Sequence, residues 1–148
     1  MGFLNWWQSE KHNEEPTSDS QQLDLLRKGN LANRRRETGA TVFRAFTDAI
    51  QANGGDRELH RESIIVETQE LFDCDVQELY KQTGGTLNDR STLPAIVQRS
   101  YLANEALSAF ELERMEGTIG GESQEENNDK IVGQVKDISK RTRRWFPW

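Results

Sequence analysis

The apolar residues between positions 38 and 116 recur at the spacing of amphipathic helices, which restricts the chain to a helical fold. One face of the segment "TGATVFRAFTDAIQANGG" carries apolar side chains at i, i+4, i+7 and i+8, namely Val42, Phe46, Ala49 and Ile50. The pair Gly54-Gly55 predicts the end of this helix. Nothing in the region alternates with period two over a useful length, so strands are not expected.

Three further segments predict helices. Asp56 can cap "RELHRESIIVETQELF", and Asp75 can cap the shorter "VQELYKQTGG". In "PAIVQRSYLANEALSAFELERMEG", Pro94 suits the first turn and Gly117 is a natural stop. The apolar face expected on this long helix is Val97, Tyr101, Leu102, Ala106, Ala109 and Phe110. The sequence therefore predicts an all-α protein, a small bundle of four or five helices over residues 23–117, best supported over 37–117, with disordered N- and C-terminal extensions.

Composition indicates that only part of the chain packs into a core. Of its 148 residues, 34% are hydrophobic and 30% are charged, against about 45–50% apolar residues, glycine included, in an ordinary globular domain. We expect an aromatic tip plus polar linker over residues 1–22, a flexible acidic linker over 118–130, and a docking tail over 131–148. The net charge of -6 argues against a protein that coats DNA without specificity. With Cys74 as its single cysteine and no run of 18 apolar residues, the chain is expected in the cytoplasm.

Candidates for catalysis are few. His60 lies among charged neighbours, where a surface position is the usual one. Cys74 stands between two Asp residues, whose charges raise a thiol pKa and disfavour a nucleophile, so a buried or half-buried residue at a helix junction is expected. Asp73 and Asp75 alone fit the opening of a calcium loop, and the paired glycines match no phosphate-binding motif. We expect no enzyme activity, no catalytic residue, no cofactor and no metal.

The C-terminal "KRTRRWFPW" interleaves cations with aromatic residues. Its candidate docking residues are Arg143, Arg144, Trp145, Phe146 and Trp148. These residues suit a peptide that docks on a protein, a tail that binds nucleic acid by stacking on its bases, or a membrane anchor. A fourth alternative is a chain end that folds back over the bundle.

Two other segments are candidate contact sites. In "MGFLNWW", the side chains that can cap a groove of the bundle or form a second docking peptide are Phe3, Leu4, Trp6 and Trp7. The triplet Arg34, Arg35 and Arg36 precedes the best helix, where cations oppose the helix dipole. This placement indicates either a contact with phosphate or an acidic partner, or a solvated charge run.

Four short motifs follow one another between residues 35 and 110: Glu78-Leu79, Thr83-Gly84, Asn88-Asp89-Arg90 and Glu105-Ala106. In this order they resemble a small helical module of damage-inducible protein D and of phage antirepressor-type proteins of the BRO kind, over about half the chain. The order "NDR" departs from the "NRD" of that pattern, and the DNA-binding N-terminal domain of such proteins is absent. The resemblance implies an accessory module from a mobile-element or stress context, with no catalytic residues to transfer.

Taken together, these patterns predict a non-enzymatic adaptor or accessory protein. A helical bundle would carry a tethered basic-aromatic C-terminal motif that docks on a protein partner with an acidic, apolar-grooved surface. The alternative is a nucleic-acid-associated regulator that uses Arg34–Arg36 and the C-terminal arginines. A peripheral membrane role ranks third, and antiparallel pairing of the helix Pro94–Glu113 between two copies would give a homodimer.

Overall fold

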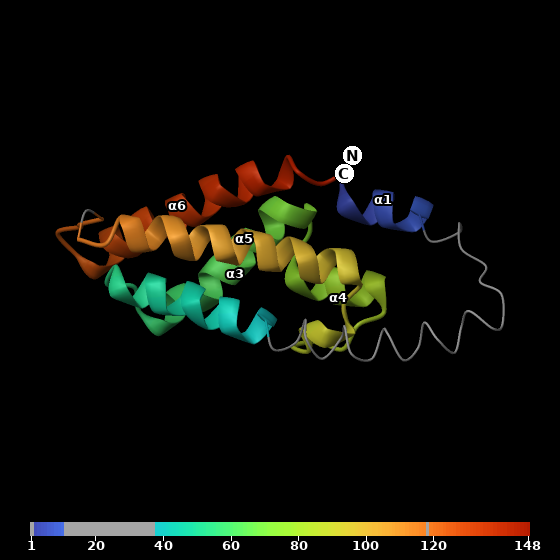
Figure 1. Ribbon diagram of the computed structural model, residues 1–148, viewed down its shortest axis with the longest axis horizontal. Helices are drawn as coiled ribbons and strands as arrows, with labels where there is room; N and C mark the ends of the chain where they lie inside the picture. The colour runs from blue at the N-terminus through green and yellow to red at the C-terminus, as the bar shows by residue number, and fades with distance from the viewer. Residues whose placement is uncertain (1, 11–37, 118) are drawn as a thin grey trace.

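The computed structural model describes residues 2–10, 38–117 and 119–148, and these residues form an all-α fold, as predicted (Figure 1). They contain six α-helices and one 3-10 turn, slightly more than the four or five helices expected. The elements are α1 (Phe3–Glu10), a helix over 38–52, α3 (Arg57–Phe72), α4 (Val76–Thr83), η1 (Arg90–Thr92), α5 (Ala95–Arg114) and α6 (Gln124–Arg143). The expectations for residues 11–37, Arg34, Arg35 and Arg36 among them, lie outside the described residues.

Local sequence signals determine several helix ends. Asp56 Oδ1 accepts a hydrogen bond from the Leu59 amide at 3.0 Å, and Asp75 Oδ1 accepts one from the Glu78 amide at 2.7 Å. Both are the expected N-caps. Gly84, with φ of 75°, ends α4 in the left-handed region that glycine adopts without strain.

The helices α3, α5 and α6 form the centre of the molecule. α5 and α6 run antiparallel along the long axis, and α3 packs against α6 (Figure 1). The side chains of Ile131, Val135 and Ile138 on α6 are fully buried. Figure 1 also places α1 beside the C-terminal end of the chain, so the two terminal segments meet at one end of the bundle.

The flexible acidic linker expected over residues 118–130 is wrong from residue 123 onward, because α6 begins at Gln124. Ser123 Oγ accepts a hydrogen bond from the Glu126 amide at 3.1 Å, which caps the helix. Glu125 and Glu126 stand in the first turn, where negative charge is favourable against the helix dipole. The acidic residues that suggested a linker therefore start a helix, and the expected tail over 131–148 is mostly a packed helix rather than a tethered peptide.

The apolar core consists of two clusters. The terminal cluster contains Phe3, Leu71, Phe72, Cys74, Leu79, Tyr80, Leu93, Val97 and Tyr101. The distal cluster contains Phe46, Ala49, Ile50, Leu59, Ala109, Leu112, Ile131 and Val135. On both α3 and α5, the buried residues between these two sets are polar, and there the candidate site lies.

Candidate functional site

A seam of buried polar side chains separates the two apolar clusters. Its members come from α3, α5 and α6: Ser63, Glu67, Thr68, Ser100, Asn104, Glu105, Ser108, Ser139 and Thr142. A buried polar group is costly unless it is hydrogen-bonded. Among them, Asn104 of α5 donates to Glu67 of α3 and to Ser139 of α6, so its amide joins the three central helices.

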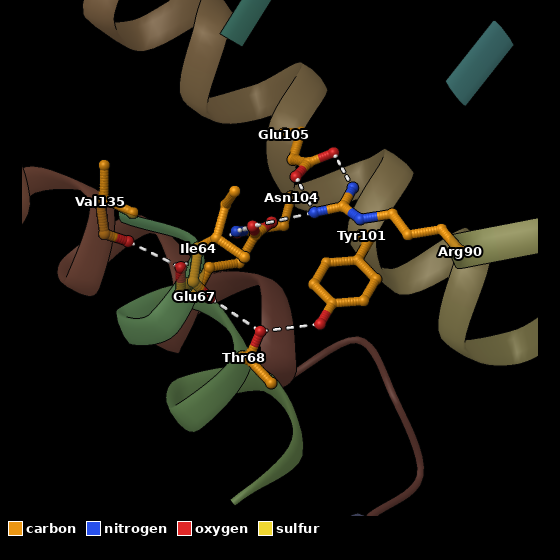
Figure 2. Close-up of polar contacts among 9 residues, drawn as sticks. Ile64, Glu67, Thr68, Arg90, Tyr101, Asn104, Glu105 and Val135 are labelled. Carbon is orange, nitrogen blue, oxygen red and sulfur yellow. Dashed lines mark hydrogen bonds and ion pairs between the residues drawn. The ribbon is translucent and has the colours of Figure 1, made fainter. Parts of the chain in front are cut away.

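Arg90 of η1 reaches into this seam and holds Glu105 (Figure 2). Its Nη1 donates to Glu105 Oε1 at 2.7 Å and its Nη2 donates to Oε2 at 2.9 Å, a bidentate pair. Nη2 also lies 4.0 Å from Oε2 of Glu67. The guanidinium carbon stands 4.1 Å from the ring centre of Tyr101 and 5.0 Å from that of Phe43, so two aromatic faces add cation–π attraction.

The carboxyl group of Glu67 is completely buried, and its surroundings favour the protonated form. Asn104 Nδ2 donates to Glu67 Oε1 at 2.9 Å and contacts Ser139 Oγ at 3.0 Å. Burial raises the pKa of Glu67 well above its usual range, and the neighbouring charge of Glu105 raises it further, while Arg90 partly opposes the shift. Because Glu105 takes both hydrogen bonds of Arg90, we place the negative charge on Glu105 and the proton on Glu67.

Tyr101 closes the network on the side of α3. The Thr68 hydroxyl donates to the Ile64 carbonyl at 2.7 Å, so the Tyr101 hydroxyl, also 2.7 Å away, donates to Thr68 (Figure 2). Burial raises the pKa of Tyr101 far above its ordinary value. The phenol is therefore fixed as a neutral donor with its ring face toward Arg90.

A cavity of about 500 Å³ borders this network. Its apolar walls come from four helices and consist of Phe43, Ile64, Val76, Tyr80, Tyr101 and Leu102. Residues 88–91, with Gln98 and Arg99, supply its polar lining, and Glu105 lies behind Arg90. Gly39, which has no side chain, and Ala40 also line the cavity. A pocket with apolar walls and a few convergent polar groups is the usual form of a ligand site.

The titratable side chains of Glu67, Cys74 and Glu105 are buried. Both oxygens of Glu105 are engaged by Arg90, and Glu67 lies behind the lining rather than in it. Burial, together with Asp75, Glu78 and Asp73, raises the pKa of the buried Cys74 thiol to about 12, in the direction that the sequence predicted. Within residues 2–10, 38–117 and 119–148, no group of three or more His, Cys, Asp or Glu side chains could hold a metal ion.

The expected C-terminal docking residues separate into packed and exposed ones. Trp148 Nε1 donates to the Leu71 carbonyl at 2.6 Å, and its ring lies 4.9 Å from Phe3 and 5.1 Å from Phe146. Trp145, by contrast, is 86% exposed. Arg144 is exposed, while Arg143 and Phe146 are half-buried. The chain end therefore folds back on the bundle, the fourth alternative above, but leaves one indole in solvent.

The N-terminal tip "MGFLNWW" covers the terminal cluster. Phe3 is fully buried, with its ring 5.1 Å from Phe72. Leu4, Trp6 and Trp7 are half-buried against the same cluster. The tip therefore caps the bundle, as in the first of the two alternatives given above, rather than forming a free second docking peptide.

The sequence did not predict the Arg90–Glu105–Glu67 network. Arg90 and Glu105 belong to the motifs that carry the resemblance above, whereas Glu67 belongs to none of them. The available signal was the occurrence of Glu67, Asn104 and Glu105 at core-facing positions of long helices, which a search for apolar stripes passes over.

The packed and exposed tryptophans predict different stability effects. Trp148→Ala should lower the free energy of unfolding by about 2–4 kcal/mol, because it removes a ring packed on Phe3 and the hydrogen bond to Leu71. Trp145→Ala, the matched control, should change it by less than about 0.5 kcal/mol. Urea unfolding followed by far-UV circular dichroism measures both. Equal small losses would contradict the packed position of Trp148.

In the part of the chain that the structure describes, no helix is long and apolar enough to cross a bilayer. Comparison of the chain with models of protein families, with curated proteins and with solved structures gives no match in any of the three.

Proposed function

We propose that this protein is a non-enzymatic adaptor that binds an acidic protein partner through the end of α6. The docking surface, called the α6-end surface below, consists of Lys140, Arg143, Arg144 and Trp145. The observation that carries the proposal is the 86% exposure of Trp145. The other three tryptophans, Trp6, Trp7 and Trp148, are half-buried against the core. Because an indole has a large apolar area, its exposure beside these cations leaves a surface that a partner can cover.

The charges around Trp145 favour an acidic partner. Lys136 and Arg141 are matched within the molecule by Glu70 at 3.9 Å and Glu111 at 2.5 Å. Lys140, Arg143 and Arg144 form no ion pair with a described carboxylate. Cations also stabilise a helix C-terminus, but that role does not account for the exposed indole. Tryptophan and arginine are the side chains most enriched at the energetic centre of interfaces.

Hydrogen bonds hold the backbone of the α6-end surface in place. The Trp145 amide donates to the Thr142 carbonyl at 3.0 Å and the Phe146 amide donates to the Arg143 carbonyl at 3.0 Å, which continues the last helical turn. Trp148 anchors the following residues on Leu71. A partner would therefore bind without having to order this segment, and covering the indole would contribute about 4–6 kcal/mol before the costs of association.

A capture experiment with matched variants tests this proposal. Purified full-length protein, its Trp145→Ala variant and its Phe110→Ala variant serve as baits in the native extract. Phe110 is also exposed, at 56%, but it lies on α5 and serves as the control for loss of any exposed aromatic ring. We expect one partner with an acidic surface to be retained by wild type and Phe110→Ala and to bind Trp145→Ala at least tenfold more weakly. Equal retention by all three baits would overturn the proposal.

The second candidate is the nucleic-acid-associated regulator, which the same surface favours because an exposed indole beside arginines can stack on a base. The two functions differ in salt dependence. Contacts to phosphate weaken steeply with added salt, whereas the burial of an indole does not. Recovery of nucleic acid with wild type, lost with nuclease or at moderate salt and absent with Trp145→Ala, would favour the regulator over the adaptor.

A further inference from the structure

The cavity beside Arg90 is distinct from the α6-end surface, and none of the residues that form that surface lines it. We propose that this cavity binds a neutral planar aromatic molecule of one or two fused rings, with a hydrogen-bond acceptor that takes an N–H of Arg90. Size, wall chemistry and charge each support one part of this proposal.

The size is that of a small-molecule site. Pockets that enclose such ligands measure about 300–1,000 Å³, and this one measures about 500 Å³. Its walls belong to the helix over 38–52, α3, α4 and α5, with η1 at the edge, so the site is built on helices rather than on one loop. A site of this construction keeps its shape when a ligand enters.

The walls favour a flat ring. Three of the six apolar side chains that form them are aromatic: Phe43, Tyr80 and Tyr101. The guanidinium of Arg90, itself planar, already lies 4.1 Å from the ring centre of Tyr101 and 5.0 Å from that of Phe43. Because Arg90 covers one face of each of these two rings, a ligand ring would pack edge-on against them or against Tyr80, with a gain beyond the area that it buries.

Arg90 has donors to spare for a ligand. A guanidinium carries five N–H groups, and Glu105 takes two of them. The side chain of Arg90 is 31% exposed and lines the cavity, whereas that of Glu105 is 2% exposed. Glu105 thus fixes the orientation of the guanidinium from behind, and its remaining edge can donate to a ligand acceptor.

The charge balance favours a neutral ligand. The charges of the four ionised side chains that line the cavity cancel: Arg90 is paired with Glu105, and Arg99 offsets Asp89. An anionic ligand would compete with Glu105 for the same guanidinium, and a cationic ligand would meet Arg90. A ring with an uncharged acceptor nitrogen or oxygen avoids both penalties.

Quinoline is a suitable probe because it is planar, neutral at pH 7.5 and carries one acceptor nitrogen. It is titrated into ¹⁵N-labelled full-length protein while amide chemical shifts are recorded, with indole, which offers a donor but no such acceptor, as the matched probe. We expect saturable shifts for residues 39–43, 88–91 and 98–105, with quinoline binding at least threefold more tightly than indole. The variant Leu102→Trp, which places a larger ring in the cavity from a half-buried position, should weaken quinoline binding at least tenfold. Phe110→Trp on the same helix, outside the cavity, should leave it unchanged.

Three outcomes would overturn the proposal. The first is the absence of saturable shifts up to 10 mM quinoline in the wild-type protein, which requires no variant to fold. The second is a shift pattern confined to the terminal cluster, which would show binding to aromatic surface elsewhere. The third is equal affinity for quinoline and indole, which would remove the role of Arg90 as a donor.

Discussion

Replacement of Arg90 with alanine is expected to lower the free energy of unfolding by about 3–5 kcal/mol, the effect of removing one partner from a buried ion pair. The carboxylate of Glu105 is 2% exposed and receives two hydrogen bonds from Arg90, at 2.7 and 2.9 Å. Without them the charge would remain buried beside Glu67. Chemical unfolding in urea at pH 7 measures the loss.

Two further variants identify the cause of the stability loss expected for Arg90→Ala. Arg141→Ala breaks a pair of similar geometry with Glu111, but both side chains are more exposed, at 50% and 20%, so we expect a loss below about 1 kcal/mol. The double variant Arg90→Met with Glu105→Leu removes both charges and should recover most of the stability that Arg90→Ala loses. If Arg90→Ala proved no more harmful than Arg141→Ala, the network would not be the stabilising element described here.

Local sequence signals were sufficient to predict most of the helices. Phe46, Ala49 and Ile50 are buried as their spacing predicted, and Asp56 and Asp75 cap the helices that follow them. These features depend on residues within a turn or two of one another. A single sequence contains that information in full.

The contacts across the bundle could not be predicted in the same way. On α5, Phe110 is 56% exposed and Ala106 is exposed, although both belonged to the expected apolar face, while Asn104 and Glu105 are buried. The burial of Glu105 is stable only because Arg90 approaches from η1, and that of Asn104 because Glu67 and Ser139 approach from two other helices. The sequence pattern of α5 alone does not indicate where those partners lie.

The raised pKa of Glu67 predicts that the free energy of unfolding depends on pH, and a single substitution at this position should remove that dependence. Its pKa is raised in the folded state, so the folded protein holds this proton more tightly than the unfolded chain. Stability from this group is therefore highest below about 4.5, the ordinary glutamate value, and falls as pH rises from there through the folded pKa. The fall has a limiting slope of about 1.4 kcal/mol per pH unit. Glu67→Gln cannot titrate, keeps an oxygen for Asn104 and can donate to Glu105, so we expect it to be more stable than wild type at neutral pH.

The difference between the two unfolding free energies, measured from pH 4 to pH 8, is the informative quantity because the titrating groups that do not interact with Glu67 cancel in it. It should be near zero at pH 4 and grow in favour of Glu67→Gln as pH rises, until it levels off above the folded pKa. Glu62→Gln, the same change at an exposed position of α3, should give a difference close to zero throughout. A flat difference curve for Glu67→Gln would show that Glu67 gives up its proton in the folded state as readily as in the unfolded chain. In that case the buried seam would carry two negative charges against the single cation of Arg90, and the assignment of the proton to Glu67 would be wrong.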